Sequence, residues 1–593
     1  DGWQLYNMVT YLTLDKSTDL KSVAAKFDEI IEANIGSKLK KENSKMRTGF
    51  QPLTDIHLNP SFQDNFSNTY GSIQNLRFFG IIAIFILIIA WVNYINLSTA
   101  KAKHRAKEVG IRKSMGACKK QLISQFLFES FLINCLATIL AVSIAFLLLP
   151  VLGQIIGKEL AFTLIQKPAF LIKLVLIVLL GSALSGFCPA FVLSSFRPIS
   201  TPKQLDIRPA SNFSLRKGLI VFQFSTALIL IASTYLIYAQ IAFMKSKDLG
   251  VDMEKIVVVH GPRIILEEKK EIQTLQYKAF KDITTSHHSV ASITSTSNIP
   301  GKGEVWYGGM RKLGDPIDVQ KIGSAVLVDA EFTKTYDLEF LAGEELRPEM
   351  EPYSAVIINE EAVKVFNLGS PIDALDESIV MSHLDTLKIQ GVIKNVHWSS
   401  LKDAHIPMIF GIHEFHAYFS IKINLSNIPE TLAHIESAYR KSFPNDPFLY
   451  YFLEDDFNRQ YQTDLQFGNL FRSFTIIAIF VACLGLYALL AFSATQRIKE
   501  IGIRKVLGAS MSNLMLLLSK EYFPLLFVAS ALSVPLIFYF GNSWLENYAF
   551  RIEMGVEFFL VPALMLVVIT LLTVSYHTYR TAKANPVESL RTE

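Results

Sequence analysis

The decapeptide Glu500-Ile-Gly-Ile-Arg-Lys-Val-Leu-Gly-Ala509 decides how this chain is organised, because it occurs twice. Its near-copy, Glu108-Val-Gly-Ile-Arg-Lys-Ser-Met-Gly-Ala117, lies 392 positions earlier. Each copy is basic and lies between two long apolar runs, so each predicts a short segment held between two membrane spans. The repeat therefore predicts a duplicated membrane unit with one recurring kind of connecting segment, named here the elbow.

The composition narrows the class of protein. Half of the residues are hydrophobic, only 19% are charged, and the net charge is +4. A soluble protein of this size usually carries about 25% charged residues, and so small a net charge gives no reason to expect a nucleic-acid partner. The four cysteines lie in or beside apolar runs, which excludes a disulfide framework or zinc-ligand spacing in the polar segments.

Seven apolar runs are each long enough to cross a hydrocarbon core of about 30 Å. They cover residues 78–100, 131–156, 174–196, 218–244, 473–496, 522–545 and 558–576. So many runs of this length favour membrane spans over buried helices of a soluble core.

Basic residues gather in alternate connecting segments. Lys and Arg outnumber Asp and Glu by eight to one, five to one and four to one in residues 101–120, 197–217 and 497–511. By the positive-inside rule, these segments and the C-terminal tail face the cytoplasm. Residues 1–76 and 245–471 then lie outside. The predicted fold class is an α-helical polytopic membrane protein with seven transmembrane helices in duplicated halves and an extracytoplasmic α+β domain.

The chain begins at Asp1 and not at a methionine. Its second half begins near Lys217 with a span, a large polar segment and then the elbow. The repeat offset places the equivalent start of the first half roughly 175 residues before Asp1. We therefore expect the natural precursor to carry another span and most of another external domain before Asp1.

Residues 245–471 form the large polar segment. Apolar alternation predicts strands and 3.6-residue periodicity predicts helices. The strands are expected at Ile256–His260, Ala355–Asn359 and Leu387–Ile393, and the helices at Lys269–Thr284, Glu360–Phe366 and Thr431–Phe443. Turns are expected at Pro300-Gly301 and Gly308-Gly309. A helical pattern over Glu454–Phe474 predicts a stalk that continues into the next span, and another over Leu20–Ile35 predicts a helix near the N-terminus.

These features divide the chain into seven parts. We expect the end of a first external domain at 1–76, a first unit of three membrane helices at 77–196, a cytoplasmic linker at 197–217, the span that opens the second half at 218–244, an external domain with its stalk at 245–471, a second unit of three membrane helices at 472–580, and a cytoplasmic tail at 581–593.

Two sets of residues resemble known families. The stretches Asn93-Tyr-Ile-Asn-Leu-Ser-Thr-Ala100 with Arg105–Ala117, and Cys483-Leu-Gly-Leu-Tyr487 with Arg497–Ala509, resemble an FtsX-like permease core. Residues 328–344, 356–372 and 391–407 resemble the MacB-type periplasmic core domain. The resemblance covers essentially the whole chain. Relative to the family layout, the sequence lacks the first span and most of the first external domain.

The resemblance implies a permease of the MacB/LolC type of ABC transporter. In that family a separate ATPase subunit binds ATP and Mg²⁺, and the permease passes motion to its periplasmic part for export or extraction at the cell envelope. Because one chain holds two halves, two ATPase copies are expected. The implied location is the bacterial inner membrane, with the lipid bilayer and a periplasmic adaptor or hydrolase as further partners. No cofactor is expected in the chain itself.

The elbows are the candidate docking sites for the ATPase. Their candidate residues are Glu108, Gly110, Arg112, Lys113 and Gly116 in the first copy and Glu500, Gly502, Arg504, Lys505 and Gly508 in the second. Glu and Arg four positions apart support a short helix, the first Gly permits close approach of a partner, and the second ends the helix. The apolar Val109, Ile111 and Met115 would lie along the membrane interface or in a partner cleft. The alternative is a basic helix held by anionic lipid, which explains the charge but not the duplicated glycines.

Glu129 and Glu521 occupy equivalent positions near the start of two spans. A carboxylate inside a membrane is costly unless it is paired or close to the headgroups. We expect either a pairing with Arg or Lys of an elbow or a position at the wet interface.

Motifs of catalysis are missing from the sequence. It holds no G-x-x-x-x-G-K-[ST] phosphate loop, no G-x-S-x-G and no H-E-x-x-H. His397, His405, His413 and His416 are close in sequence but lack the cysteines or acidic partners typical of metal sites. We expect no catalytic residue, metal or enzymatic activity in this chain. The other function classes considered are a signalling or scaffold protein that controls a periplasmic enzyme such as a cell-wall hydrolase without transport, and a membrane enzyme, which the missing motifs disfavour.

Overall fold

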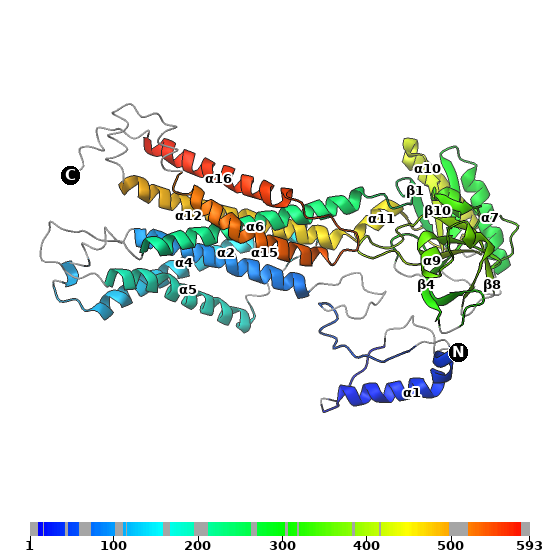
Figure 1. The fold of residues 1–593 in the computed structure, drawn as a ribbon, viewed down its shortest axis with the longest axis horizontal. Helices are drawn as coiled ribbons and strands as arrows, with labels where there is room; N and C mark the ends of the chain where they lie inside the picture. The colour runs from blue at the N-terminus through cyan, green and yellow to red at the C-terminus, as the bar shows by residue number, and fades with distance from the viewer. Residues whose placement is uncertain are drawn as a thin grey trace. The chain divides into compact units, whose positions relative to one another are not determined.

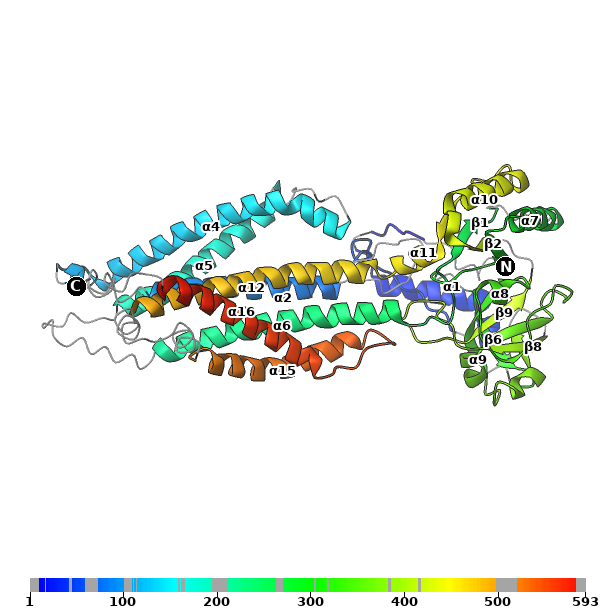
Figure 2. The ribbon, with the colours of Figure 1, turned by 90° about the horizontal axis from the view of Figure 1, so that it is seen from above.

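The chain folds into a unit of long helices and a unit built around a β-sheet, shown as ribbons in Figures 1 and 2 from a computed structural model. The sheet unit contains Asp1–Ile73, Phe243–Gln462 and Tyr548–Phe550, and the helical unit contains Gln74–Ala242, Thr463–Asn547 and Arg551–Glu593. The structure describes residues 10–15, 17–41, 45–58, 73–100, 109, 111–113, 115–157, 160, 166–194, 212–262, 270–302, 306–316, 319–381, 386–413, 417–496 and 520–582.

Seven helices of the described residues are long and apolar enough to cross a membrane. They are α2 (Ile73–Ala100), α4 (Lys119–Ile156), α5 (Pro168–Ser194), α6 (Asn212–Ser246), α12 (Gln462–Gln496), α15 (Phe523–Leu545) and α16 (Glu557–Ala582). Each overlaps one of the seven apolar runs, which confirms that part of the predicted fold class. Their outward faces expose large side chains such as Leu136, Leu147 and Phe527, as expected of helices surrounded by lipid.

The helix α6 is the most enclosed member of the helical unit. In its most apolar window 61% of the residues are buried, whereas none are buried in the corresponding window of α4. Residues of α6, α12, α15 and α16, among them Phe224, Leu228, Leu486 and Leu526, form one continuous apolar core. The core of the helical unit therefore lies around α6 and mainly within the second half of the chain.

Amide side chains join α2 and α6 to the middle of α12, and the three helices run side by side in Figures 1 and 2. Asn93 Nδ2 of α2 donates to the carbonyl oxygen of Val481 at 2.7 Å. Gln223 Nε2 of α6, which is buried, donates to the carbonyl oxygen of Ala482 at 2.7 Å. In hydrocarbon, such interhelical hydrogen bonds hold helices together where apolar contacts alone give little preference over lipid.

The sheet unit contains a closed ring of six strands. Its strands pair in the order β4, β3, β7, β8, β6, β9 and back to β4, and β5 is added at β8. These strands are β3 (Trp306–Lys312), β4 (Lys321–Val328), β5 (Phe340–Gly343), β6 (Ala355–Asn359), β7 (Ser378–Met381), β8 (Thr386–Ile393) and β9 (Met408–Ile412). Buried side chains including Val356, Ile389 and Ile409 form its core with α9 (Glu360–Val365).

Four more strands extend from the ring in the order β11, β1, β10, β2. They are β1 (Ile256–His260), β2 (Val290–Thr296), β10 (Tyr418–Ile423) and β11 (Tyr450–Phe452). The helices α7 (Lys270–Thr285) and α10 (Ile428–Ser442) pack on this sheet through Phe280 and Tyr439. The ring of Phe280 contacts the rings of both Phe419 and Tyr439. The remaining elements of the unit are α1 (Leu20–Lys41), α8 (Phe332–Thr335), α11 (Leu453–Arg459) and two 3₁₀ turns at Asp373–Asp376 and Leu425–Asn427.

Asp329 joins the ring to the four-stranded sheet. Its carboxylate accepts hydrogen bonds from Tyr277 Oη at 2.6 Å, Thr294 Oγ1 at 2.5 Å and the backbone N–H of Ser295 at 3.1 Å. It also accepts from the N–H of Glu331 at 3.1 Å. Burial raises the pKa of this carboxyl group, and the hydrogen bonds that it accepts act in the opposite direction.

The predicted strands and helices of residues 245–471 are confirmed to within a few residues, and α1 confirms the helix predicted near the N-terminus. The turn predicted at Gly308-Gly309 is wrong, because both residues lie inside β3 and pair with Gly323 and Ile322 of β4. The stalk is two helices and not one, since α11 ends at Arg459 and α12 begins at Gln462. Leu453, Phe457 and Tyr461 are buried in the sheet unit, and Tyr461 Oη accepts from the N–H of Leu401 at 3.2 Å.

Candidate functional site

The first elbow ends in a tight helical turn just before α4. Val109 and residues 111–113 are helical, and the N–H of Gly116 donates to the carbonyl oxygen of Lys113 at 3.0 Å. Gly116 has a φ of +93°, a conformation that glycine adopts without the steric cost of a Cβ atom. The expectation that this glycine ends the helix agrees with that geometry.

One side of the elbow packs against α4 and is hydrogen-bonded to it. Val109 is 3% exposed and packs against Leu122 and Phe126 of α4. Arg112 Nη1 donates to Gln125 Oε1 of α4 at 2.5 Å. The sequence-based prediction that Val109 lies with Ile111 and Met115 at an interface with lipid or a partner is wrong, because Val109 is buried against α4.

The opposite side of the elbow faces outward. Ile111 is 53% exposed and Met115 is 76% exposed, and the partly exposed Arg112 and Lys113 lie between them in sequence. Apolar side chains beside cations make a surface that a protein groove with acidic edges can bind, or that can rest on anionic lipid. The geometry of this elbow is therefore compatible with both sequence-based hypotheses.

Several of the candidate residues lie outside the described residues. They are Glu108 and Gly110 of the first elbow and Glu500, Gly502, Arg504, Lys505 and Gly508 of the second. Their helix, close-approach and docking roles stay predictions.

The two repeated acids lie in unlike surroundings. Glu129 is part of α4 and is partly exposed, whereas Glu521 is exposed in the turn just before α15. Both residues take part in interactions with other groups. The predicted pairing with an elbow Arg or Lys stays a prediction.

The histidine-rich region of the sheet unit holds two histidines in contact. The rings of His397 and His405 lie 4.2 Å apart between centroids, and Phe550 meets both rings at 4.6 Å and 5.0 Å. Burial, His405 and Lys247 together lower the pKa of His397 to about 4, against a weaker opposite effect of Asp248. Among the described residues, no group of three or more His, Cys, Asp or Glu is placed to hold a metal ion.

Sequence reasoning missed the polar side chains inside the membrane helices. Asn93, Asn134 and Gln223 all make hydrogen bonds to another helix of the helical unit. The available signal was an amide within an otherwise apolar run, because such a group is costly in hydrocarbon unless a neighbouring helix satisfies it.

The duplicated helices match a known family twice. The FtsX-like permease C-terminal family matches residues 80–198 and 472–586, so one match covers α2, α4 and α5 and the other covers α12, α15 and α16. Each match includes one elbow and the helices on both of its sides.

Similarity to individual proteins is weaker and partial. The macrolide export ATP-binding/permease protein MacB of Shewanella sp. (strain ANA-3) is 24% identical over 197 residues, which cover 33% of this chain and 29% of that protein. The uncharacterized ABC transporter permease YknZ of Bacillus subtilis (strain 168) is 31% identical over 138 residues, which cover 23% of this chain and 30% of that protein. The matched segments thus span less than a third of the length of either relative.

Among solved structures, the periplasmic region of MacB from Actinobacillus actinomycetemcomitans aligns with 36% of this chain and 94% of its own length, at 10% identity and a TM-score of 0.25. The sequence matches are the basis for assigning the family. With two copies of the matched domain and seven helices suited to a membrane, the chain carries two FtsX-like permease domains, and parts of its sequence are similar to MacB and YknZ.

Proposed function

We propose that this chain is the transmembrane subunit of an ABC transporter whose separate ATPase docks on the two elbows. The observation that carries the proposal is the duplication of the elbow within two FtsX-like permease segments. One elbow in each half gives two equivalent docking surfaces, so two ATPase copies are expected, with ATP and Mg²⁺ bound by the ATPase.

The exposed side of the first elbow supports this proposal. Ile111 and Met115 present apolar surface next to Arg112 and Lys113, while Val109 and Arg112 fix the elbow to α4. A partner that pushes on this surface also moves α4, because the elbow and α4 share a packed core and a hydrogen bond. Motion from ATP binding and hydrolysis would then enter the membrane helices and pass along the chain to residues 245–471.

The proposed function places residues 245–471 outside the cytoplasm and the elbows inside it. The charge asymmetry of the connecting segments supports this orientation. It is tested with single cysteines in a background without native cysteines, one replacing Met115 and one replacing Ile322, which are 76% and 74% exposed. An impermeant maleimide applied to intact cells should label position 322 and not position 115; the reverse pattern would contradict the orientation.

Association with an ATPase tests the function itself. An ABC ATPase subunit from the same organism, co-expressed with this chain, should co-purify with it at about two copies per chain, and its ATP hydrolysis rate in liposomes should change when the chain is present. Failure to associate would contradict the proposal. A complex that hydrolyses ATP but changes only the activity of an external hydrolase, without moving cargo, would instead support the signalling class.

A further inference from the structure

Equivalent positions in the two halves of the chain carry side chains of different polarity in and beside their helical hairpins. Here the first hairpin means α4 with α5, and the second hairpin means α15 with α16. Two polar positions of the first half, Tyr94 and Asn134, have apolar counterparts 392 residues later, Leu486 and Leu526, and Ser130 corresponds to Tyr522.

In the first hairpin, these residues form a polar seam. Asn134 Nδ2 of α4 lies 3.3 Å from Ser185 Oγ of α5, and it also donates to the carbonyl oxygen of Ser130 at 2.8 Å. The Oγ of Ser130 is 3.3 Å from Tyr94 Oη of α2. The seam therefore links α2, α4 and α5.

The two helices of the first hairpin also approach closely at a glycine. A Cβ atom at Gly186 of α5 would lie 3.0 Å from Leu127 Cδ2 and 3.0 Å from Ser130 Oγ, both on α4. Close backbone approach at a small residue is typical of tightly packed membrane helices. In Figure 2 the two helices run together as a pair.

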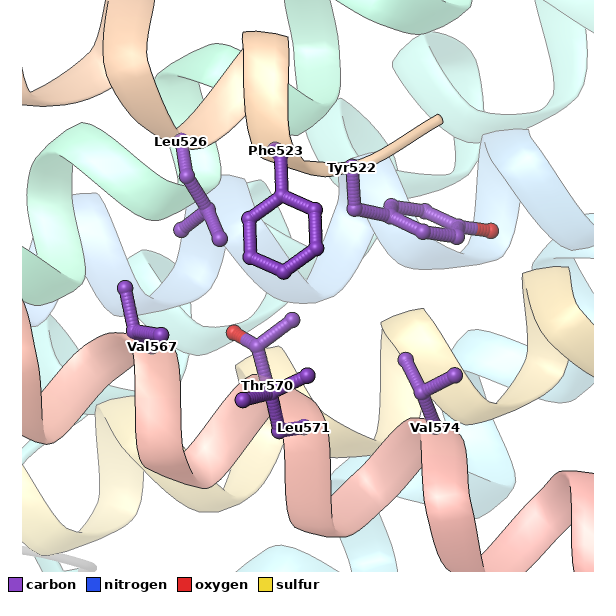
Figure 3. A pocket seen from close by; sticks show the side chains of 7 residues that line it. All are labelled: Tyr522, Phe523, Leu526, Val567, Thr570, Leu571 and Val574. Atoms are coloured by element: carbon purple, nitrogen blue, oxygen red, sulfur yellow. The ribbon is translucent and has the colours of Figure 1, made fainter. Parts of the chain in front are cut away.

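The second hairpin has an apolar crevice where the first has its seam. It is a shallow crevice lined by Tyr522, Phe523 and Leu526 on the α15 side and by Val567, Thr570, Leu571 and Val574 on α16 (Figure 3). Leu526 replaces Asn134, so the hydrogen bond that Asn134 donates to α5 in the first hairpin has no counterpart at this position of α15.

The helix α15 is instead bonded to α6. Ser225 Oγ of α6 lies 3.3 Å from the carbonyl oxygen of Ala529, and Ser533 Oγ of α15 lies 3.3 Å from the carbonyl oxygen of Ser225. The polar contacts of α4 thus join it to its hairpin partner, whereas these contacts of α15 join it to a different helix.

We propose that the two hairpins differ mechanically: α4 and α5 keep a fixed separation and move together with α2, whereas α15 and α16 change their separation. In hydrocarbon, a broken interhelical hydrogen bond leaves polar groups without water to replace it. Apolar contacts between helices can be replaced by contacts with lipid chains at little cost in free energy. This inference goes beyond the proposed function and is measured on the chain alone, so it stands or fails separately from ATPase docking.

Pulsed electron–electron spin resonance between nitroxide labels tests the proposal in the full chain reconstituted in lipid nanodiscs. The native cysteines Cys118, Cys135, Cys188 and Cys483 are first replaced. Labels at Leu136 and Leu180 report on the first hairpin, and labels at the equivalent Val528 and Val568 report on the second. All four positions are at least 45% exposed on the outer faces. The distance distribution should be about twofold broader for the second pair; equal widths, or a broader first pair, would overturn the proposal.

The double substitution Asn134→Leu with Ser185→Ala tests whether the seam is the cause. It gives position 134 the residue of its counterpart, Leu526, and removes the hydroxyl that Asn134 contacts. The distribution for labels at 136 and 180 should broaden towards that of the second hairpin, while the second pair stays unchanged. An unchanged first pair would overturn the proposal. If the double variant fails to insert, Ser185→Ala alone, which retains Asn134, is measured against the same two outcomes.

Discussion

Asn93 contacts Gly485, the residue that occupies its own equivalent position in the second half of the chain. A Cβ atom on Gly485 would lie 2.1 Å from Asn93 Oδ1. Phe79 and Phe471, which are also equivalent, lie 6.2 Å apart between ring centroids. Residues that touch their own counterparts lie on a two-fold axis, so the pseudo-two-fold axis of the duplicated helices runs between α2 and α12, which are parallel.

The contact predicts that Gly485→Ala is destabilising. Alanine usually stabilises a helix relative to glycine by about 0.5–1 kcal/mol, but here its Cβ would collide with the amide of Asn93. Overpacking of this kind costs about 1–3 kcal/mol, so the melting temperature of the purified chain in detergent should fall. Gly80→Ala in α2 is the matched control, because a Cβ there meets nothing within 4 Å.

A double-mutant cycle separates the collision from a general effect on α12. Asn93→Ala with Gly485→Ala removes the group that the new Cβ would meet, and the double variant should recover part of the melting temperature lost by Gly485→Ala. Strictly additive losses would contradict direct contact, because uncoupled residues add within about 0.5 kcal/mol.

Asp329 should be needed to hold the ring of strands against the four-stranded sheet. Asp329→Ala leaves Tyr277 Oη, Thr294 Oγ1 and the N–H of Ser295 without their acceptor. A buried polar group that loses its partner costs about 1–3 kcal/mol, so hydrogen exchange in β2 and β4 should become roughly a hundredfold faster. The exposed Asp282→Ala is the control, and equal exchange in the two variants would refute this role for Asp329.

His397 predicts a loss of stability in mild acid. Its pKa is about 4 in the folded chain, below the ordinary value of 6.5, so the unfolded chain binds more protons between these values. The neutral His397 ring makes its full contribution to the free energy of unfolding above about pH 6.5. That contribution is lost progressively as the pH falls to about 4.

The pH dependence is measured as the difference in melting temperature between pH 7.5 and pH 5. His397→Phe, which keeps a ring against Phe550 but does not titrate, should make that difference smaller. His57→Phe, at an exposed position, should leave it unchanged. A difference that is the same in His397→Phe and the unsubstituted chain would show that another group is responsible.

The sequence predicted those parts of the fold that depend on local pattern. Charge-free runs predicted the seven membrane helices, and buried runs such as Ala355–Asn359 predicted strands, because each pattern reports burial along one element. The break at Gln460–Tyr461 was missed because neither residue is a glycine or proline. Gly308 and Gly309 were mistaken for a turn, because only pairing with β4 shows that they lie in a strand.

The sequence likewise predicted those features of the candidate site that depend on local pattern alone. The end of the elbow helix follows from Gly116, whose role is set by its own backbone conformation. The burial of Val109 depends on Leu122 and Phe126, and so requires the packing of α4. The contact between Asn93 and Gly485 depends on how the two halves meet, which a repeat in the sequence does not specify.

Charge reversal at both elbows tests the central claim, which is that the elbows dock an ATPase. The variant carries Arg112→Glu, Lys113→Glu, Arg504→Glu and Lys505→Glu. Its control carries Lys119→Glu and Lys120→Glu at the start of α4, two exposed basic residues whose counterparts are not basic. The measurement is the amount of ATPase that co-purifies with chain inserted to normal levels.

Because Arg112 also bonds to Gln125 of α4, the comparison is made only on chain that inserts to normal levels, and a loss of the complex there reports on docking. The account predicts that the elbow variant loses most of the co-purifying ATPase while the control retains it. Normal association in the elbow variant would contradict the claim and favour anchoring of the elbows by anionic lipid.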